Sequence, residues 1–550
     1  MKVLQIGKHN WAEQYEIDES VEWDYCSANQ VVATVTAYIA ETIKEKGRLE
    51  TYDCLLLTDA NFSLFALDKL AQIIDPYRVI YDRTLELSPE LQTFLGYKCA
   101  WKLDVTKPAE LIRQITYYFF PGQSGVRTTP LQINISPNYF GPVNYRGSSQ
   151  LDLEIDYGNT YQPLLSWGNS FYMDPLKDLE FWLEFQKDAT CDLQLVFEDV
   201  GYSAHYNGSR RYVVTGDELA KPNLIYGHKH ASNLMITLYA KGKGKLTIGL
   251  LHTRWSRGPF GNYFLGGKRT VAPKREEVYS FFSPGNLKPP LCVYFSGYRS
   301  LEGFEGYFMM RSLKHPFLLI TDPRLEGGAF YIGTKEYEQQ VKAAIEAALK
   351  RLNFTNEQLI LSGMSMGTFG ALYYGAQLSP HAIILNKPLI HLGQMAAKIQ
   401  TARPYAFGTS LDLLLKLTAR NDVAGADSLD QRIWAAFSKG DFEKTTFAIA
   451  YMENDDYDLT AFNVIMELLA SRKSQAKLIS QGFLGRHNDD FIENAKWFKN
   501  QYKRILAEDF TRGTKQWEIL FTGIISSGPM RLAPKLRSKV KKVSSLKTTY

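Results

Sequence analysis

Cysteine is scarce in this sequence, and its spacing is not that of a metal site. The five cysteines are scattered over 550 residues, and several lie inside apolar runs. No CxxC pair occurs, which argues against a zinc site, a thiol redox motif and a disulfide framework. We therefore expect a reduced, cytoplasmic environment and no bound metal. The cysteines are Cys26, Cys54, Cys99, Cys191 and Cys292.

Long apolar runs are also missing. No stretch of 18 apolar residues occurs, so no transmembrane helix is predicted. The first residues, MKVLQIGKHN, contain only a short apolar run before charged residues begin, which is too short for the core of a signal peptide. Neither a Walker phosphate loop nor the glycine spacing of a dinucleotide fingerprint is present. We therefore expect no bound cofactor.

Acidic residues are absent from one segment of the chain. Residues 531–550 hold seven basic residues and no acidic ones, while the formal net charge of the whole chain is +5. The rest of the chain is therefore close to neutral, which argues against a nucleic-acid-binding protein. The basic segment is either a solvated end or a contact to an anionic membrane surface or an acidic partner.

An alternation of strands and helices is present in residues 1–122. A length of 550 residues predicts two to four domains. Strands that alternate with helices predict a parallel, Rossmann-like α/β domain in this first region. The predicted strands are residues 2–7, 52–59, 78–82 and 99–104, and the predicted helices are residues 31–47, 65–74 and 109–120.

Residues 123–272 have the period-two pattern of strands with little helical pattern. Several short strands with regular turns predict a β-sandwich. The sequence KGKG at 241–244 is typical of a hairpin between two of these strands. Four aromatic residues of this region form either a platform for a sugar or part of the core. They are Tyr145, Trp167, Tyr172 and Trp255.

The alternation returns in residues 273–512, which predicts an α/β-hydrolase domain with a doubly wound sheet. An amphipathic helix at 335–352 comes directly before one of its strands. Residues 513–550 are interpreted as a separate basic tail. The predicted strands are residues 291–298, 315–322, 357–363, 381–388, 445–455 and 476–483.

The pattern G-x-S-x-G occurs as GMSMG at 363–367, with Ser365 at its centre. The pattern alone arises easily by chance, but here it follows a predicted strand and precedes a predicted helix. That is the setting of a nucleophile elbow, whose glycines permit a sharp turn that exposes the serine hydroxyl. We therefore predict that Ser365 is a nucleophile.

A serine nucleophile needs a base and an acid, which follow it along the chain in the order serine, acid, histidine on this fold. His381 and His391 come before any acid loop, which leaves His487, between the last strand and the last helix. The acid is expected in residues 453–458. We favour Asp456. The alternatives are Asp455 and Glu453.

An oxyanion hole needs two backbone N–H groups. One is expected from Met366, directly after the nucleophile. The other is expected from Tyr298, in the loop after an early strand, where Gly297 permits close approach. A second glycine-rich loop, TDPRLEGGAF, is either a plain loop or lines the pocket through Arg324 or Glu326.

GMSMG, the acid loop AYMENDDYD and His487, behind an α/β region and a β-rich region, together resemble one family. This family is the second of the accessory Sec proteins of Gram-positive bacteria. The resemblance implies a cytoplasmic, partly membrane-associated protein that works with two companion accessory Sec proteins and the accessory Sec motor ATPase. Its implied clients are serine-rich repeat adhesins, whose N-acetylglucosamine residues it O-acetylates while supporting their export.

The implied reaction is acyl transfer from a donor that no motif of the sequence identifies. Under the resemblance, Ser365, His487 and one acid near 453–456 match the triad by position. Two other functions are compatible with the residues: a serine esterase or deacylase of the same fold, and a secretion scaffold that kept the fold without catalysis.

Overall fold

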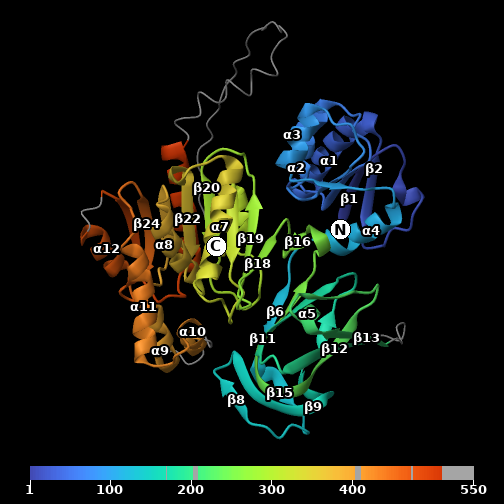
Figure 1. Ribbon diagram of the computed structural model, residues 1–550. Helices are drawn as coiled ribbons and strands as arrows, with labels where there is room; N and C mark the ends of the chain where they lie inside the picture. The colour runs from blue at the N-terminus through green and yellow to red at the C-terminus, as the bar shows by residue number, and fades with distance from the viewer. Residues whose placement is uncertain (169, 202–208, 403–409, 472–474, 511–550) are drawn as a thin grey trace, which may run out of the picture. The chain divides into compact units, whose positions relative to one another are not determined.

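The computed structural model describes residues 1–168, 170–201, 209–402, 410–471 and 475–510. The chain divides into two compact units, Met1–Tyr502 and Lys503–Tyr550, and the three sheets described below lie in the first of them (Figure 1). The predicted basic tail lies outside the described residues. Within the described residues, no helix is both long enough and apolar enough to cross a lipid bilayer.

The N-terminal sheet has five parallel strands in the order β2-β1-β3-β4-β5, as expected for the Rossmann-like prediction. Its central strand β3 is buried along its whole length. Neither β2 nor α3 was predicted from the sequence. β2 (EWDYC) is a polar strand at the edge of the sheet, so it lacks the apolar pattern of a buried strand. The strands are β1 (Lys2–Ile6), β2 (Glu22–Cys26), β3 (Cys54–Leu57), β4 (Val79–Asp82) and β5 (Trp101–Leu103), and the helices are α1 (Val31–Lys46), α2 (Leu67–Ile73), α3 (Pro89–Tyr97) and α4 (Pro108–Tyr118).

The second sheet joins ten antiparallel strands through the long strands β9 and β15. Hydrogen bonds connect all ten strands into one sheet with a single apolar core. The β-sandwich stays a prediction. The strands are β6 (Gly125–Thr128), β7 (Ile133–Ile135), β8 (Val143–Arg146), β9 (Gln150–Trp167), β10 (Phe171–Met173), β11 (Leu179–Lys187), β12 (Cys191–Gly201), β13 (Ser209–Thr215), β14 (Asn223–Ile225) and β15 (Ser232–Trp255), with a short helix α5 (Gly216–Leu219).

The hairpin predicted at 241–244 is wrong, because β15 runs through these residues without turning. Gly242 has a φ of +90°, and a side chain there would place its Cβ 2.0 Å from the carbonyl oxygen of Thr190. The register with β9 also shifts at this point. The glycines therefore permit an irregular bend and the close approach of a neighbouring turn.

The third sheet has eight strands in the order β18-β19-β21-β20-β22-β23-β24-β25. All neighbours from β21 to β25 are parallel, and β18 and β19 add an antiparallel edge that the sequence did not predict. Because β18 pairs here, the predicted domain boundary at 272 falls a few residues too late. The strands are β18 (Lys268–Val271), β19 (Glu277–Ser283), β20 (Leu291–Phe295), β21 (Phe317–Thr321), β22 (Leu359–Met364), β23 (Ala382–Asn386), β24 (Thr446–Met452) and β25 (Lys477–Phe483).

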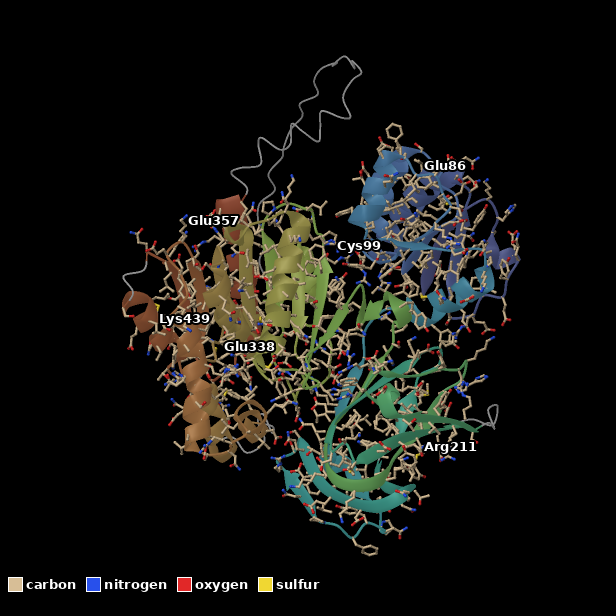
Figure 2. All side chains as sticks on the ribbon, viewed as in Figure 1. Glu86, Cys99, Arg211, Glu338, Glu357 and Lys439 are labelled. Carbon is tan, nitrogen blue, oxygen red and sulfur yellow. The ribbon has the colours of Figure 1, made fainter. Side chains whose placement is uncertain are left out.

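Helices pack on this sheet and are tied to one another by polar contacts. Glu338 of α7, labelled in Figure 2, accepts a hydrogen bond of 2.8 Å from the hydroxyl of Tyr373 on α8 and pairs with Arg432 of α11. The helices are α6 (Tyr307–Ser312), α7 (Lys335–Leu352), α8 (Met366–Leu378), α9 (Leu392–Ala402), α10 (Ser410–Thr418), α11 (Val423–Phe437), α12 (Ala461–Ser471) and α13 (Phe491–Ile505), and a short ladder, β16 (Gly261–Asn262) with β17 (Phe264–Leu265), precedes β18.

A buried ionic cluster connects the ten-stranded sheet to the eight-stranded one. Arg254 of β15 pairs with Glu277 of β19 at 2.7 Å and with Glu302 at 2.6 Å. His252, also on β15, bonds to the other oxygen of Glu302. Burial alone would raise the pKa of Glu302, but the charges of Arg254 and His252 hold it well below its ordinary value. Since isolated buried charges are strongly unfavourable, each sheet completes the charge pairing of the other.

Candidate active site

Ser365 lies on the sharp turn between β22 and α8. Its backbone has φ 51° and ψ −120°, a conformation that residues other than glycine rarely adopt. The turn is held by the N–H of Ser365, which donates to the carbonyl oxygen of Asn386 at 2.8 Å. The turn follows the C-terminal end of the buried strand β22, so it lies at the carboxyl edge of the sheet. The predicted strand–turn–helix setting of the motif is confirmed.

The two glycines of the motif are required by the space around the turn. A Cβ on Gly363 would lie 2.2 Å from the carbonyl carbon of Gly367, and a Cβ on Gly367 would lie 2.1 Å from the carbonyl oxygen of Phe295. Both neighbours are backbone atoms, which cannot rotate away. Any side chain at either position therefore displaces β20 or α8.

We expect Gly367→Ala to lower the free energy of unfolding by about 2 kcal/mol or more, because the added methyl group overlaps the backbone of β20. The control is Gly96→Ala in α3, where the new Cβ would meet nothing within 4 Å. That change should stay within about 1 kcal/mol of the parent protein. Chemical denaturation of both variants measures the difference, and equal effects would contradict the steric argument.

Ser365, His487 and Asp455 form a continuous hydrogen-bonded chain. The Oγ of Ser365 lies 2.8 Å from Nε2 of His487, and Nδ1 of His487 lies 2.8 Å from Oδ2 of Asp455. With the Nδ1 proton donated to the carboxylate, Nε2 is the nitrogen that can accept the serine proton. His487 is only 3% exposed and Asp455 6%. The geometry is that of a nucleophile, a base and an orienting acid.

The loop after β24 holds the Asp455 carboxylate by backbone donors. Its Oδ1 accepts the N–H groups of Tyr457 at 2.9 Å and of Asp458 at 3.1 Å. Burial alone would raise the pKa of Asp455, but the hydrogen bond and charge of His487 and these two N–H groups hold it below its ordinary value. The carboxylate is therefore ionised and fixed in orientation.

The favoured acid, Asp456, is not the residue that faces the imidazole. Its Oδ1 accepts the backbone N–H of His487 at 3.1 Å, so it contacts the same residue through the main chain. Glu453, the third candidate, is exposed, and its N–H pairs with Phe483 of β25. The loop turns back directly after the strand, with the N–H of Asp455 near the carbonyl of Met452, and this turn selects Asp455.

Two backbone groups near Ser365 are suited to an oxyanion hole. Met366 is the first residue of α8, so its N–H has no acceptor within its own helix. The N–H of Gly297 is committed to Glu305 at 2.6 Å, which leaves Tyr298 as the next donor along the loop. Gly297 approaches β22 closely, since a Cβ there would lie 3.0 Å from the carbonyl oxygen of Met364. The roles of Met366 and Tyr298 stay predictions.

The side chain of Tyr298 is fixed from the second glycine-rich loop. Its hydroxyl donates to Glu326 at 2.8 Å, and burial together with this carboxylate raises the pKa of Tyr298 to about 12. Of the alternatives that the sequence left open for this loop, a pocket lined by Arg324 does not fit. Arg324 is 1% exposed and pairs with Asp322 and Glu276.

Sequence reasoning missed Lys387, which contacts the backbone of His487. Its Nζ donates to the carbonyl oxygen of His487 at 2.7 Å, and its side chain is almost fully buried. Burial lowers the pKa of Lys387, while the charge of Asp455 opposes this. The signal in the sequence was a lysine placed directly after the run AIILN, in which Asn386 is the only polar residue.

A second histidine–carboxylate pair lies beside the acid loop. Nδ1 of His391 is 2.8 Å from Oδ1 of Asp458, whose other oxygen accepts the N–H of Ile390 at 2.7 Å. Burial alone would lower the pKa of His391, but the hydrogen bond and charge of Asp458 raise it above its ordinary value. The pair therefore ties the loop after β23 to the loop that carries Asp455.

This pair predicts a pH-dependent contribution to stability. Because the pKa of His391 is raised in the folded state, its contribution to the free energy of unfolding is fully present below its unfolded pKa of about 6.5. That contribution is lost as pH rises through the folded pKa. We therefore expect His391→Gln to lower the apparent melting temperature more at about pH 5.5 than at about pH 8.5. An equal loss at both pH values would show that the ring acts only as a neutral hydrogen-bond partner.

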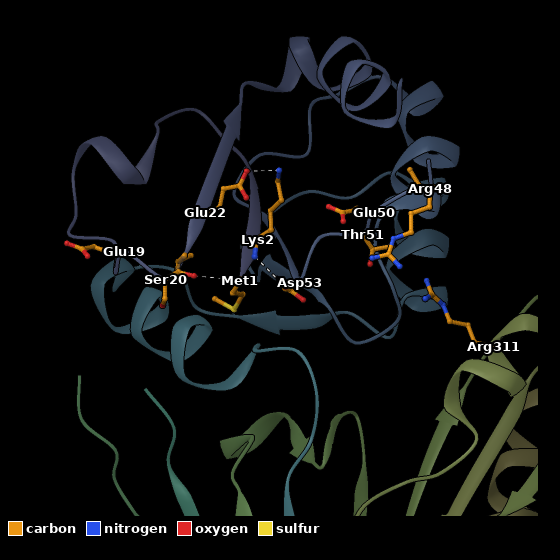
Figure 3. Close-up of a pocket in the computed structure, with 12 residues that line it drawn as sticks. Met1, Lys2, Glu19, Ser20, Glu22, Arg48, Glu50, Thr51, Asp53 and Arg311 are labelled. Atoms are coloured by element: carbon orange, nitrogen blue, oxygen red, sulfur yellow. Dashed lines mark hydrogen bonds and ion pairs between the residues drawn. The ribbon is translucent and has the colours of Figure 1, made fainter. Parts of the chain in front are cut away.

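A cavity of about 800 Å³ lies in the N-terminal part of the chain, and none of the triad residues lines it (Figure 3). Lys2 in its lining contacts two carboxylates of the same lining. Lys2 Nζ lies 2.7 Å from Glu22, and the backbone N–H of Lys2 donates to Asp53 at 2.9 Å.

A hydrogen-bonded serine, histidine and aspartate on a strand-to-helix turn is the arrangement that serine hydrolases and acyltransferases share. The chain belongs to the accessory secretory protein 2 family, because the family model described as Accessory Sec system GspB-transporter matches residues 1–512. The resemblance seen in the sequence is therefore confirmed.

Individual relatives agree with the family model over most of the chain. The accessory Sec system protein of this family from Staphylococcus aureus is 38% identical over 518 residues, covering 93% of this chain and 97% of the relative. Its counterpart from Streptococcus gordonii is 37% identical over 516 residues, covering 93% and 99%. A chain of the Glycosylation Associate Protein (Gap123) complex from Streptococcus agalactiae has a TM-score of 0.85 at 38% identity, covering 93% of this chain and 99% of that chain.

Proposed function

We propose that this protein is a serine-dependent O-acetyltransferase that modifies N-acetylglucosamine on serine-rich repeat glycoproteins and supports their export. The observation that carries the catalytic part is the continuous chain from Ser365 through His487 to Asp455. Membership of the accessory Sec family supports the client and the pathway. The strand order of the third sheet, with an antiparallel edge and the nucleophile after a central strand, supports an α/β-hydrolase domain.

In the first half-reaction, the Oγ of Ser365 attacks the carbonyl carbon of an acetyl donor while His487 accepts its proton. The negative oxygen that forms is stabilised by the N–H groups of Met366 and Tyr298. The intermediate then expels the donor's leaving group, which takes the proton from His487. The product is acetyl-Ser365. Asp455 stabilises the charged imidazole throughout.

In the second half-reaction, a sugar hydroxyl takes the place of the leaving group. His487 accepts the hydroxyl proton, the sugar oxygen attacks the acetyl carbonyl, and the Oγ of Ser365 leaves with the proton from His487. Attack by water would give acetate instead, so transfer requires that the acceptor displaces water. The donor belongs to the class of activated acetyl esters or thioesters. No resident cofactor or metal enters this scheme.

The export role involves companion proteins. The Gap123 complex contains a chain similar to this one over nearly its whole length, which supports assembly with two companion accessory Sec proteins. We further propose that the assembly delivers the glycoprotein to the accessory Sec motor ATPase at the cytoplasmic face of the membrane. Residues 513–550 would supply a peripheral contact to anionic lipid through their basic side chains. No nucleic acid takes part.

The experiment that tests this function measures how an acetyl group partitions between sugar and water. The purified full chain is incubated with para-nitrophenyl acetate and a serine-rich peptide that carries O-linked N-acetylglucosamine, and the products are quantified by mass spectrometry. We expect acetylated glycopeptide to form at the expense of acetate as the glycopeptide concentration rises. Acetate alone would favour the esterase alternative.

A third outcome separates catalysis from scaffolding. If neither product forms with this donor or with an acetyl thioester, while export in cells requires the protein, the scaffold alternative replaces the transferase. The unglycosylated peptide is the control for the acceptor. Acetylation of that peptide would show that the acceptor is an amino-acid side chain rather than a sugar.

A further inference from the structure

A cavity of about 320 Å³ opens in the ten-stranded sheet, apart from the triad. Three aromatic residues line it: Phe171 and Tyr172 of β10, and Trp255 at the end of β15. Tyr172 is 52% exposed and Val126 of β6, also in the lining, is 44% exposed. The cavity therefore presents exposed aromatic and aliphatic side chains within a mixed lining, and its volume suits a small molecule or one or two sugar rings.

The structure divides the four aromatic residues that the sequence singled out. Tyr172 and Trp255 line this cavity, whereas Trp167 is 2% exposed in the apolar core. Tyr145 lies on β8, outside the cavity, with its side chain 41% exposed. The sugar platform and the core were alternatives in the sequence. Only Tyr172 and Trp255 lie in the cavity, so only these two of the four can belong to a sugar platform there.

Polar groups in the same lining are placed to bind hydroxyl groups. Thr128 and Thr253 belong to the lining as well. Asp174 accepts the indole N–H of Trp255 at 2.8 Å, which fixes the ring and leaves further acceptor capacity on the carboxylate. Gln132 and Ser170 add an exposed amide and an exposed hydroxyl.

The charges of the lining favour a neutral ligand. Two arginines contribute to it, and both are committed to the protein. Arg254 pairs with Glu277 and Glu302, and Arg127 donates to the carbonyl oxygens of Pro323 at 2.7 Å and Ser300 at 3.0 Å. An anionic ligand would find no uncommitted cation there. A neutral sugar matches the lining better, since its C–H face packs on aromatic rings while its hydroxyls bond to amide, hydroxyl and carboxylate groups.

Strand β6 connects this cavity to the loop that carries Tyr298. Val126, Arg127 and Thr128 all contribute to the cavity, and the guanidinium of Arg127 also reaches the loop after β20 through its bond to Ser300. The carbonyl oxygen of Gly125 accepts the N–H of Glu302 in that loop at 2.8 Å. Strand β6 therefore contacts both the cavity and the loop after β20.

We propose that this cavity binds a neutral saccharide, as a site separate from the acetylation centre. The identity of the saccharide as the N-acetylglucosamine of the client rests on the proposed function. A second sugar site holds the glycoprotein while one of its sugars occupies the acetylation centre. This arrangement raises the local concentration of acceptor hydroxyls at acetyl-Ser365.

The test measures binding of the glycosylated serine-rich peptide to the full chain by isothermal titration calorimetry. The parent is Ser365→Ala, which prevents turnover, and the unglycosylated peptide is the ligand control. We expect Tyr172→Ala to weaken binding about fivefold or more through loss of ring stacking. Adding Val126→Asp should weaken it further. Both side chains are substantially exposed, so neither change removes a core contact.

Tyr145→Ala is the matched control, because it removes an exposed tyrosine of the same sheet outside the cavity. It should leave the affinity unchanged. Unchanged affinity in the Tyr172→Ala, Val126→Asp double variant, or binding that does not depend on the sugar, would overturn the proposal. If these variants bind normally and the wild-type chain acetylates the peptide, the cavity proposal fails and the proposed function stands. If the cavity binds the sugar but no acetyl group is transferred, the reverse holds.

Discussion

Replacing Ser365 with alanine should reduce acetyl transfer by about 10⁴-fold or more, because it removes the hydroxyl that we propose forms the acetyl-enzyme. The change removes one oxygen that lies 2.8 Å from His487 and leaves the backbone of the turn as it is. Alanine tolerates the conformation of the turn no better and no worse than serine. The free energy of unfolding should therefore stay within about 1 kcal/mol of the parent.

The measurement is acetylation of the serine-rich glycopeptide by mass spectrometry, together with thermal unfolding of the same sample. Ser362→Ala provides a control, since Ser362 lies on the same strand but bonds to the backbone of Val293 inside the sheet. It should affect stability and leave transfer largely intact. Undiminished acetylation by a well-folded Ser365→Ala protein would exclude the acyl-enzyme mechanism.

Asp455→Asn should lower the turnover number by about 10³- to 10⁴-fold, because an amide no longer stabilises the charged imidazole or selects the tautomer with its proton on Nδ1. The side chain lies 2.8 Å from that nitrogen and is held by two backbone N–H groups. The asparagine oxygen can still accept those N–H groups. The loop should therefore keep its form, and the effect should fall on turnover rather than on folding.

Asp456→Asn is the matched control, one residue away in the same loop. Its carboxylate accepts the backbone N–H of His487 at 3.1 Å, and an asparagine oxygen can accept that bond as well. We expect a loss of less than about tenfold. Turnover of para-nitrophenyl acetate by both variants compares them directly. A larger loss for Asp456→Asn than for Asp455→Asn would reverse the assignment of the acid.

Periodicity was sufficient to predict the parallel strands of the first and third sheets other than β2. The run EQLILSG became β22 and SMGTFGALYYGAQL became α8, because a buried parallel strand is apolar throughout and a closely packed helix is rich in small residues. Edge strands were harder. EWDYC carries two acids and an exposed face, and its pattern gave no sign that it would pair with β1.

The hairpin predicted at residues 241–244 was wrong for a different reason. The glycines at 242 and 244 have the composition of a turn, but their conformation serves a bend in one long strand. Composition alone does not distinguish a chain reversal from a close approach of another backbone. Only the position of Thr190 beside Gly242 decides between them.

For the site, chain order was enough to select Ser365 and His487, since topology fixes which loops meet at the carboxyl edge of the sheet. The choice between neighbouring acids depended on the turn that brings the N–H of Asp455 toward Met452. A difference of one residue in a turn leaves no trace in periodicity. Lys387 escaped notice for a related reason, because its partner is a backbone carbonyl and not a side chain.

The buried ionic cluster has a consequence for how this protein can be taken apart. Arg254 and His252 come from one sheet and Glu277 and Glu302 from the other side of the boundary. A fragment cut between them would carry uncompensated charges on its new surface, and a chimera with a distant homologue would join halves with mismatched charges. The proposed catalytic and export roles are therefore best separated by point substitutions rather than by truncation.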